Sequence, residues 1–191
     1  MLNKKLSTAV VLTAALLVTP AVRAADVAGV HLDDRARIGN ADLVLNGAGV
    51  RTKVFFKVYV AALYAAKKTT AASALVETRD PRRMALHMMR DLDADSLVGA
   101  LKEGLHNNHS PAELAKLKAE IDQFEGLMRG VGNARKGDLI TIDFSGEGTN
   151  IGFNGQPRGS VAGEPFGRAL LKVWLGDKPA DTDLKQALLG G

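Results

Sequence analysis

The chain has 191 residues and a formal net charge of +4, with 46% hydrophobic and 24% charged residues. This balance is typical of one ordinary globular domain and excludes an intrinsically disordered chain or a polytopic membrane protein. The sequence contains no cysteine, which excludes disulfides, thiolate catalysis and cysteine-ligated metal centres.

The first 24 residues have the pattern of a secretory signal peptide. Two lysines precede an apolar stretch over residues 6–18, and Val22 and Ala24 place small side chains at the −3 and −1 positions of a cleavage site. The apolar stretch is shorter than the roughly 20 residues of a membrane span. We therefore predict cleavage after Ala24 and a mature domain over residues 25–191. This domain would have no transmembrane segment and would be periplasmic or secreted.

Most of the positive net charge belongs to these 24 residues. The remaining chain has 22 basic and 21 acidic residues, a net charge of +1. Because non-specific attraction to nucleic acid depends on an excess of positive charge, we predict no nucleic-acid partner.

The first part of the mature chain predicts mainly strands. Residues 26–46 contain short apolar segments that predict two short strands, and Asn46-Gly47 is a turn dipeptide. From Gly49 to Tyr64, period-two alternation rich in β-branched and aromatic residues predicts one long strand or a bent pair of strands. A short helix is predicted over residues 70–76, and another strand over residues 82–89.

The middle of the chain predicts a helical hairpin. Residues 93–107 place leucine and valine on one helical face. The next helix begins with Ser110 as N-cap, Pro111 at the first helical position and Glu113 at the third, which is a capping box. Its single apolar stripe runs to Met128.

Strands and then helices complete the chain. Alternation returns at residues 140–144 and 151–153, Asn154-Gly155 is a hairpin turn, and a short strand follows near residues 160–162. The final helices are predicted over residues 164–174 and 183–189. This order predicts an α+β domain in which an antiparallel sheet packs on helices.

Several possible catalytic or metal-binding patterns fail on spacing. The glycines between Gly146 and Gly155 lack the spacing of a phosphate-binding loop, so we interpret them as turn glycines. His106 and His109 have no acidic third ligand nearby, so we predict no metal and no cofactor. No serine lies in a nucleophile-elbow motif, and no catalytic residue is assigned.

Arg51, Tyr59 and Tyr64 carry the candidate binding chemistry. A guanidinium offers a planar fork to a carboxylate or an enolate oxygen, and a phenol donates to the same oxygen. On a straight strand at roughly 3.3 Å per residue, Arg51 and Tyr59 would be about 26 Å apart, and Tyr64 would face the other side. The three converge only if the segment bends, bulges or forms a hairpin. Otherwise they are a strand arginine and two packing tyrosines.

The sequence around these residues resembles the bacterial chalcone isomerase-like proteins. The segments that carry the resemblance are Asn46-Gly47-Ala48-Gly49-Val50-Arg51, residues 53–64, Lys136-Gly137-Asp138, Asn154-Gly155 and the run from Phe166 to Gly190. The resemblance covers the mature chain. It implies an open-faced β-sandwich, in which a layer of helices covers a large antiparallel sheet and a ligand cleft lies between them.

The resemblance also implies roles for the candidate residues. Arg51 matches an arginine that steadies a substrate oxygen in plant chalcone isomerases and receives a carboxylate in the plant fatty-acid-binding relatives. Tyr64 matches a tyrosine that accompanies this arginine in the fatty-acid-binding branch, and Tyr59 lies near a cleft threonine of the isomerases. The helix over residues 93–107 departs from the isomerases because it contains no tyrosine.

We therefore predict a non-enzymatic binder of a fatty acid or a similar amphipathic carboxylate, in which Arg51 pairs with the anion and Tyr64 and Tyr59 assist. Three side chains would line the apolar part of the cleft: Phe55, Phe56 and Leu101. One alternative is an isomerase or intramolecular lyase with an unidentified substrate, in which Arg51 stabilises an oxyanion and Tyr59 transfers a proton. Another is an envelope protein that binds a protein partner and no small ligand.

Overall fold

The computed structural model describes residues 25–191, and the predicted signal peptide lies outside the described residues. Its body is a seven-stranded antiparallel sheet in which each strand pairs with the next along the chain. The strands of this sheet are β3 (Arg35–Ile38), β4 (Ala41–Lys53), β5 (Phe56–Ala65), β6 (Arg82–Met88), β7 (Leu139–Phe144), β8 (Gly148–Phe153) and β9 (Gln156–Ala162). A separate hairpin consists of β1 (Ala25–Val27) and β2 (Val30–Leu32).

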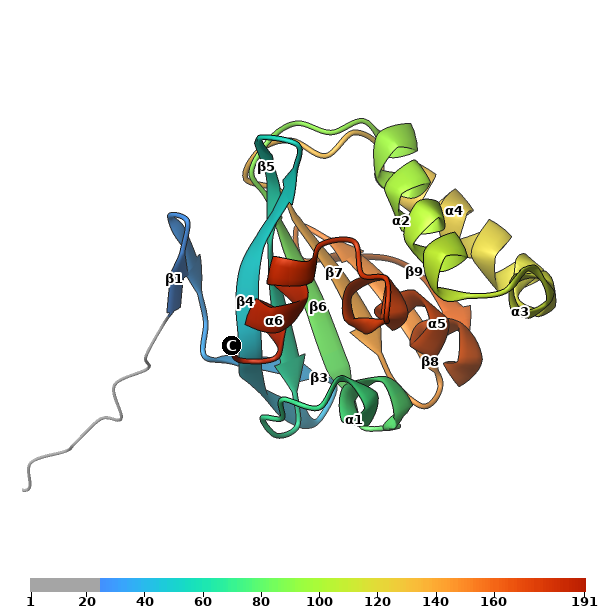
Figure 1. The fold of residues 1–191 in the computed structure, drawn as a ribbon, viewed down its shortest axis with the longest axis horizontal. Helices are drawn as coiled ribbons and strands as arrows, with labels where there is room; N and C mark the ends of the chain where they lie inside the picture. The colour runs from blue at the N-terminus through green and yellow to red at the C-terminus, as the bar shows by residue number, and fades with distance from the viewer. Residues whose placement is uncertain (1–24) are drawn as a thin grey trace, which may run out of the picture.

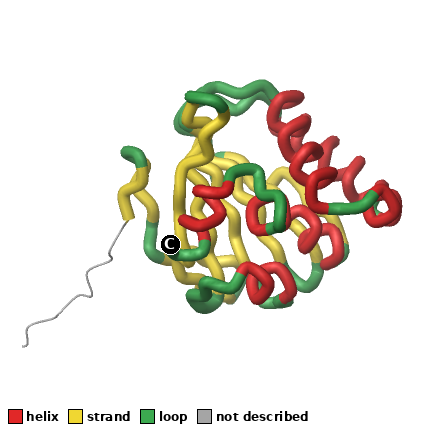
Figure 2. The backbone as a smooth tube through the Cα atoms, viewed as in Figure 1, coloured by secondary structure: helices red, strands yellow, loops and turns green. Residues whose placement is uncertain are grey.

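The helices gather on one face of the sheet (Figures 1 and 2). They are α1 (Ala72–Glu77), α2 (Ala94–Asn108), α3 (Pro111–Lys116), α4 (Lys118–Val131), α5 (Glu164–Leu175) and α6 (Thr182–Leu188). The main core lies between this layer and the sheet, and Phe166 and Trp174 of α5 are among its largest buried side chains. Within residues 25–191, no helix is long and apolar enough to span a bilayer.

The opposite face of the sheet has a smaller apolar core. Leu43, Val60 and Tyr64 are buried there, together with Leu32 of the β1–β2 hairpin. Both faces of β5 are therefore covered, and from Tyr59 to Ala65 successive residues enter different cores. This separation decides which of the candidate residues can meet.

The predicted α+β class and the sheet-and-helix architecture are confirmed. The stretch from Gly49 to Tyr64 is the bent pair of strands, formed by the end of β4 and most of β5 around a turn at Val54 and Phe55. The capping box at Ser110 is present. The helix that it begins divides at Leu117, whose N–H bonds the carbonyl three residues earlier, so the chain forms α3 and α4 instead of one helix.

The prediction of a turn at Asn46-Gly47 was wrong, because these residues form a bulge inside the continuous strand β4. The Asn46 side chain is buried and bonds the backbone of two distant segments. Its Nδ2 donates to the Leu188 carbonyl at 2.7 Å, and its Oδ1 accepts from the Thr69 N–H at 2.8 Å. The Asn-Gly dipeptide does favour a local change of backbone direction, and packing against the C-terminal helix makes this change a bulge in β4.

The Arg51 cleft as candidate functional site

Hairpin pairing places Arg51 directly opposite Tyr59 in the register of β4 and β5. The guanidinium carbon lies 5.7 Å from the centroid of the Tyr59 ring. A straight strand would separate the two residues by about 26 Å. The turn between the strands thus brings together two of the three residues that the sequence singled out.

Two glycines on the same strand allow a helix to approach Arg51. A Cβ atom on Gly47 would lie 2.2 Å from the Ala187 carbonyl oxygen, and one on Gly49 would lie 2.7 Å from the Ala187 Cβ. Since Gly47, Gly49 and Arg51 alternate along β4, all three face the helix layer. The Gly-x-Gly-x-Arg pattern is therefore the surface on which α6 packs.

Asp181 joins the beginning of α6 to the strand next to Arg51. Its Oδ1 accepts from the Leu184 N–H as the N-cap bond of α6, and its Oδ2 accepts from the Thr52 N–H, both at 3.0 Å. Both carboxylate oxygens are thus bonded to backbone amides. Asp181 fixes the edge of the site without forming an ion pair with Arg51.

Arg51 is half-buried and lacks a protein counter-ion. Within residues 25–191, no carboxylate oxygen lies within 4.0 Å of its guanidinium nitrogens, and its buried Nε has no hydrogen-bond partner. A buried donor without a partner is uncommon and costs about 1–3 kcal/mol. Arg51 is therefore a cation with unused hydrogen-bonding capacity.

Tyr59 contacts Arg51 from the main core. Its side chain is 2% exposed, and its hydroxyl accepts a 3.0 Å hydrogen bond from Nε1 of Trp174 in α5. Burial raises the pKa of the Tyr59 phenol, although the nearby charge of Arg51 opposes this shift. The phenol therefore stays protonated at neutral pH. The indole fixes the position of the Tyr59 ring, and this ring contacts the Arg51 guanidinium.

A cleft of about 180 Å³ opens above Arg51 between the sheet and α2. Its lining consists of Arg51, Thr52 and Lys53 at the end of β4, Ala100, Glu103, Gly104 and Asn107 of α2, and Pro179 and Ala180 of the loop before α6. Arg51 and Lys53 supply positive charge, and Glu103 supplies one negative charge across the opening. The lining has a net positive charge suited to a small anion.

The structure does not bring Tyr64 to this cleft. Tyr64 is buried in the core on the opposite face of the sheet, where its hydroxyl donates to the Asp33 carbonyl at 2.9 Å. Burial raises the pKa of this phenol to about 12. Tyr59 and Tyr64 are five positions apart on one strand, and an odd separation directs side chains to opposite faces. The prediction that Arg51 and Tyr64 bind one ligand together does not fit this structure, because the two side chains lie on opposite faces of the sheet.

The predicted apolar lining is also absent from the cleft. Phe55 and Phe56 are exposed at the tip of the β4–β5 hairpin, beyond the cleft. Leu101 is buried in the main core, and the neighbouring Ala100 reaches the cleft in its place. The exposed position of the phenylalanines follows from the turn at Val54 and Phe55, which ends the alternation of both strands.

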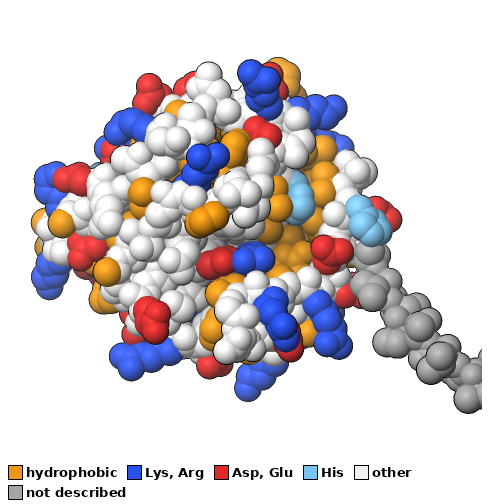
Figure 3. Space-filling view, turned by 180° about the vertical axis from the view of Figure 1, so that it is seen from behind, with side chains coloured by type: hydrophobic (Ala, Val, Ile, Leu, Met, Phe, Trp, Pro, Cys, Tyr) orange, Lys and Arg blue, Asp and Glu red, His pale blue; other side chains and the backbone are white. Residues whose placement is uncertain are grey.

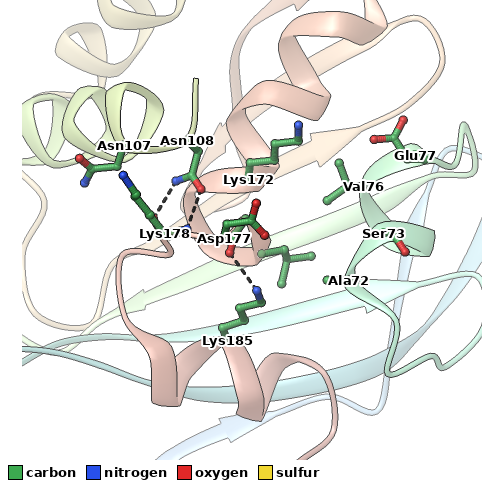
Figure 4. Close-up of a pocket in the computed structure, with 12 residues that line it drawn as sticks. Ala72, Ser73, Val76, Glu77, Asn107, Asn108, Lys172, Asp177, Lys178 and Lys185 are labelled. Atoms are coloured by element: carbon green, nitrogen blue, oxygen red, sulfur yellow. Dashed lines mark hydrogen bonds between the residues drawn. The ribbon is translucent and has the colours of Figure 1, made fainter. Parts of the chain in front are cut away.

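A second hollow, of about 340 Å³, lies beside α1, α6 and the C-terminal ends of α2 and α5 (Figure 4). Asn107 lines both this hollow and the Arg51 cleft. The Asn108 side chain donates to the Lys178 carbonyl at 2.7 Å and accepts from its N–H at 3.0 Å, and the Lys185 ammonium donates to the Gly176 carbonyl at 2.9 Å. These bonds hold the loop that closes the Arg51 cleft.

A larger groove of about 510 Å³ runs between α3 and α5. Three of its ionised side chains, Glu77, Glu113 and Arg168, already have partners, whereas Lys116, Glu120 and Lys172 form no ion pair among the described residues. Arg168 pairs with Glu164 and Glu77, while Glu113 completes the capping box with Ser110. Size alone would favour this groove, but the Arg51 cleft is lined by a guanidinium whose buried Nε lacks a partner.

The two histidines near the end of α2 contact backbone. His106 Nδ1 lies 2.8 Å from the Lys102 carbonyl oxygen, and His109 Nε2 lies 3.1 Å from that of Ala169. Within residues 25–191, no group of three histidine or acidic side chains is arranged to hold a metal ion.

The family model for chalcone isomerase-like proteins matches residues 24–190. The chain belongs to the chalcone isomerase-like family. Among solved structures, an Arabidopsis thaliana fatty-acid binding protein is similar at a TM-score of 0.66 and 18% sequence identity, over 91% of this chain and 95% of that one. Among curated proteins, no sequence matches. At this identity, the structural likeness shows a shared fold.

In this chalcone isomerase-like domain, sequence reasoning missed the residues that surround Arg51. Trp174, Glu103 and Asn107 come from helices far along the chain, and no spacing relates them to β4. Asp181 did carry a signal, because an aspartate directly before a helix is a favoured N-cap. Its second bond, to Thr52, depends on tertiary packing.

Proposed function

We propose that the Arg51 cleft binds the carboxylate of a fatty acid or a similar amphipathic ligand. The observation that carries this proposal is the half-buried Arg51 guanidinium, which has an unpaired Nε and no counter-ion among residues 25–191. A carboxylate offers two acceptor oxygens in the geometry of the guanidinium fork. Binding would remove an energetic penalty that the free protein carries.

The fold supports the same ligand class. The Arabidopsis protein with this fold is described as a fatty-acid binding protein. We infer that the present domain uses the space between its sheet and its helix layer in a related way, with Arg51 as the anchor for the head group.

The size of the cleft defines what it can hold. At about 180 Å³ it is smaller than the ~300–1,000 Å³ of ordinary small-molecule sites. It accommodates a carboxylate head and the first few carbons. A longer chain would extend along α2 or displace this helix from β4, so affinity should rise with chain length only up to the point where α2 must move.

The isomerase alternative needs a group at the cleft that transfers a proton. Tyr59 was its candidate, but this phenol lies beneath the cleft and accepts from Trp174, and burial raises its pKa. The other alternative is a protein that binds a partner protein and no small ligand. An ion pair between Arg51 and an internal acid would favour this alternative. Asp181, the acid joined to Thr52 next to it, instead bonds backbone amides.

Titration of saturated fatty acids of increasing length into wild-type protein and Arg51→Ala tests the proposal. We expect binding by the wild type and at least tenfold weaker binding by the variant, since a hydrogen bond to a charged group contributes about 1.5–3 kcal/mol. Arg35→Ala removes an exposed arginine of the edge strand β3 and is the matched control. Equal affinity in wild type and Arg51→Ala would contradict the proposal.

We also propose that the domain acts outside the cytoplasm, on the basis of the charge, length and small-residue pattern of its first 24 residues. Mass spectrometry of protein expressed from the full sequence in a Gram-negative host should find a periplasmic species that begins at Ala25. Recovery of only the full-length chain in the cytoplasm would contradict this assignment.

A further inference from the structure

The tip of the β4–β5 hairpin exposes a cluster of apolar side chains. Val54 is 76% exposed, Phe55 90% and Phe56 60%, and these are the only large hydrophobic residues so exposed within residues 25–191. The tip lies at one end of the molecule, at the top of Figure 1, and away from β1 and the C-terminus. Clustered exposed apolar side chains of this kind mark a contact surface more often than isolated ones do.

The turn residues are unfavourable for the turn that they form. Val54 has φ of +59°, a left-handed conformation that a β-branched residue rarely adopts. With Lys53 opposite Phe56, this is a two-residue hairpin loop whose first central position normally carries glycine. Folding alone would favour glycine at this position. A valine at this position is better explained by a function of the exposed side chain.

Cations surround this apolar tip. Lys53 and Lys57 flank it in sequence, and the Arg90 guanidinium carbon lies 4.8 Å from the centroid of the Phe56 ring. Among the described residues, none of these three cations has a carboxylate within 4.0 Å. The view from behind shows hydrophobic side chains next to lysine and arginine at the upper edge of the molecule (Figure 3).

The neighbouring turn adds two further basic residues to this end. Gly137 N–H bonds the Met88 carbonyl in β6, which places Arg135 and Lys136 on the turn beside the base of the hairpin. The acids on the same turns accept hydrogen bonds from backbone amides. Asp91 accepts from the Lys136 N–H at 2.8 Å, and Asp138 accepts from the Arg135 N–H at 2.6 Å.

We propose that the hairpin tip is a membrane-contact element that inserts Val54 and Phe55 into the surface of an anionic lipid bilayer. Apolar side chains that enter the headgroup region and cations that remain at the anionic surface are the two components of interfacial membrane binding. A protein partner fits less well, because a stable protein interface buries about 800 Å² on each side, whereas this tip is a small protrusion.

Membrane contact would also affect the Arg51 cleft. Arg51, Thr52 and Lys53 line the cleft, and the tip follows them directly in the chain. A protein held by its tip would therefore have the mouth of the cleft close to the bilayer, where amphipathic carboxylates partition. The inference does not require that the cleft bind a ligand, so vesicle binding and ligand binding can fail separately.

Co-sedimentation with lipid vesicles tests the proposal. The probes are phosphatidylcholine vesicles and vesicles in which about a third of the lipid is phosphatidylglycerol. We expect binding to the anionic vesicles that weakens as salt is added, and weaker binding to the neutral ones. Phe55→Ser should bind at least tenfold more weakly while keeping the wild-type unfolding temperature, because this side chain is almost fully exposed.

Two paired variants separate the cations of the tip from general positive charge. Lys53→Gln/Lys57→Gln should lose about tenfold in affinity for anionic vesicles and part of the salt dependence, because Arg90, Arg135 and Lys136 remain. Lys67→Gln/Lys68→Gln removes the same charge from exposed positions at the other end of β5 and should bind like the wild type. Phe55→Trp should show a blue-shifted emission component on anionic vesicles, since the single native tryptophan is buried in the core.

Three results would overturn the proposal. The first is the absence of vesicle binding by the wild type. The second is unchanged binding by Phe55→Ser. The third is a wild-type dimer that Phe55→Ser dissociates, seen by analytical ultracentrifugation without vesicle binding, which would assign the tip to a second copy of the chain.

Discussion

Gly47→Ala tests how α6 is held against the sheet, and with it how the edge of the Arg51 cleft is built. The added Cβ would lie 2.2 Å from the Ala187 carbonyl oxygen and 2.7 Å from that of Leu188. Both contacts are with backbone, so no side-chain rotation relieves them. Either α6 or β4 must move by roughly 1 Å to reach an ordinary van der Waals separation.

The expected loss of stability lies between two cases, local adjustment of the backbone and separation of α6 from the sheet. If β4 and α6 adjust locally, overpacking costs about 1–3 kcal/mol. If α6 separates from the strand, Leu184 and Leu188 lose their burial at about 1.5–3 kcal/mol each, and Asn46 loses its bond to the Leu188 carbonyl. We therefore expect a loss of about 2–5 kcal/mol in the free energy of unfolding, a large part of the ~5–15 kcal/mol of an ordinary domain.

Urea denaturation of the wild type and the variant measures this loss. Gly99→Ala is the matched control, because Gly99 lies on the exposed side of α2 with nothing within 4 Å of a Cβ atom. The same substitution should stabilise the protein there by about 0.5–1 kcal/mol, since alanine has the better helix propensity. If the free energy of unfolding of Gly47→Ala lies within 0.5 kcal/mol of the wild-type value, the proposed close packing of α6 is incorrect.

Other changes test the remaining parts of the account. Arg82→Met should lose about 2–4 kcal/mol in the free energy of unfolding measured with urea. Arg82 is 2% exposed, and its guanidinium bonds three carbonyl oxygens at the end of α1. A loss below 0.5 kcal/mol would contradict this prediction. Glu103→Gln should tighten fatty-acid binding a few-fold, because it removes the negative charge that faces Arg51 across the cleft, and weaker binding in a titration would show that Glu103 assists the ligand. Bonds from Arg168 hold the pKa of Glu164 below its ordinary value, so the contribution of Glu164 is present above the unfolded-state pKa and disappears as the pH falls through the folded-state pKa. The urea midpoints of wild type and Glu164→Gln should therefore differ at pH 7 and converge once the pH falls below the folded-state pKa of Glu164, and a gap that persists in acid would refute the pairing.

Elements with a strong local signal were predictable from the sequence. The capping box at Ser110 and the alternation of β7 appear where their local patterns place them. The alternation between Gly49 and Tyr64 indicated a bent pair of strands as one of two possibilities, and this possibility is the observed hairpin. These features depend on residues close together in the chain.

Features that depend on distant packing were not predictable. The turn signal at Asn46-Gly47 became a bulge because the α6 backbone approaches Gly47 and Asn46 bonds Leu188. Tyr64 was assigned to the cleft by family resemblance, whereas the strand period directs it to the opposite core. Strand alternation had already identified this conflict, and the structure resolves it in favour of the local geometry.

The most direct measurement of the central claim compares dodecanoate with dodecanol in wild-type protein and in Arg51→Ala. The two ligands share a chain and differ in the carboxylate, so their affinity ratio isolates the contribution of the charge. The account predicts that the wild type prefers dodecanoate by tenfold or more and that the ratio falls close to one in Arg51→Ala, because the preference comes from the guanidinium. A ratio that is the same in both proteins would contradict a carboxylate site at Arg51.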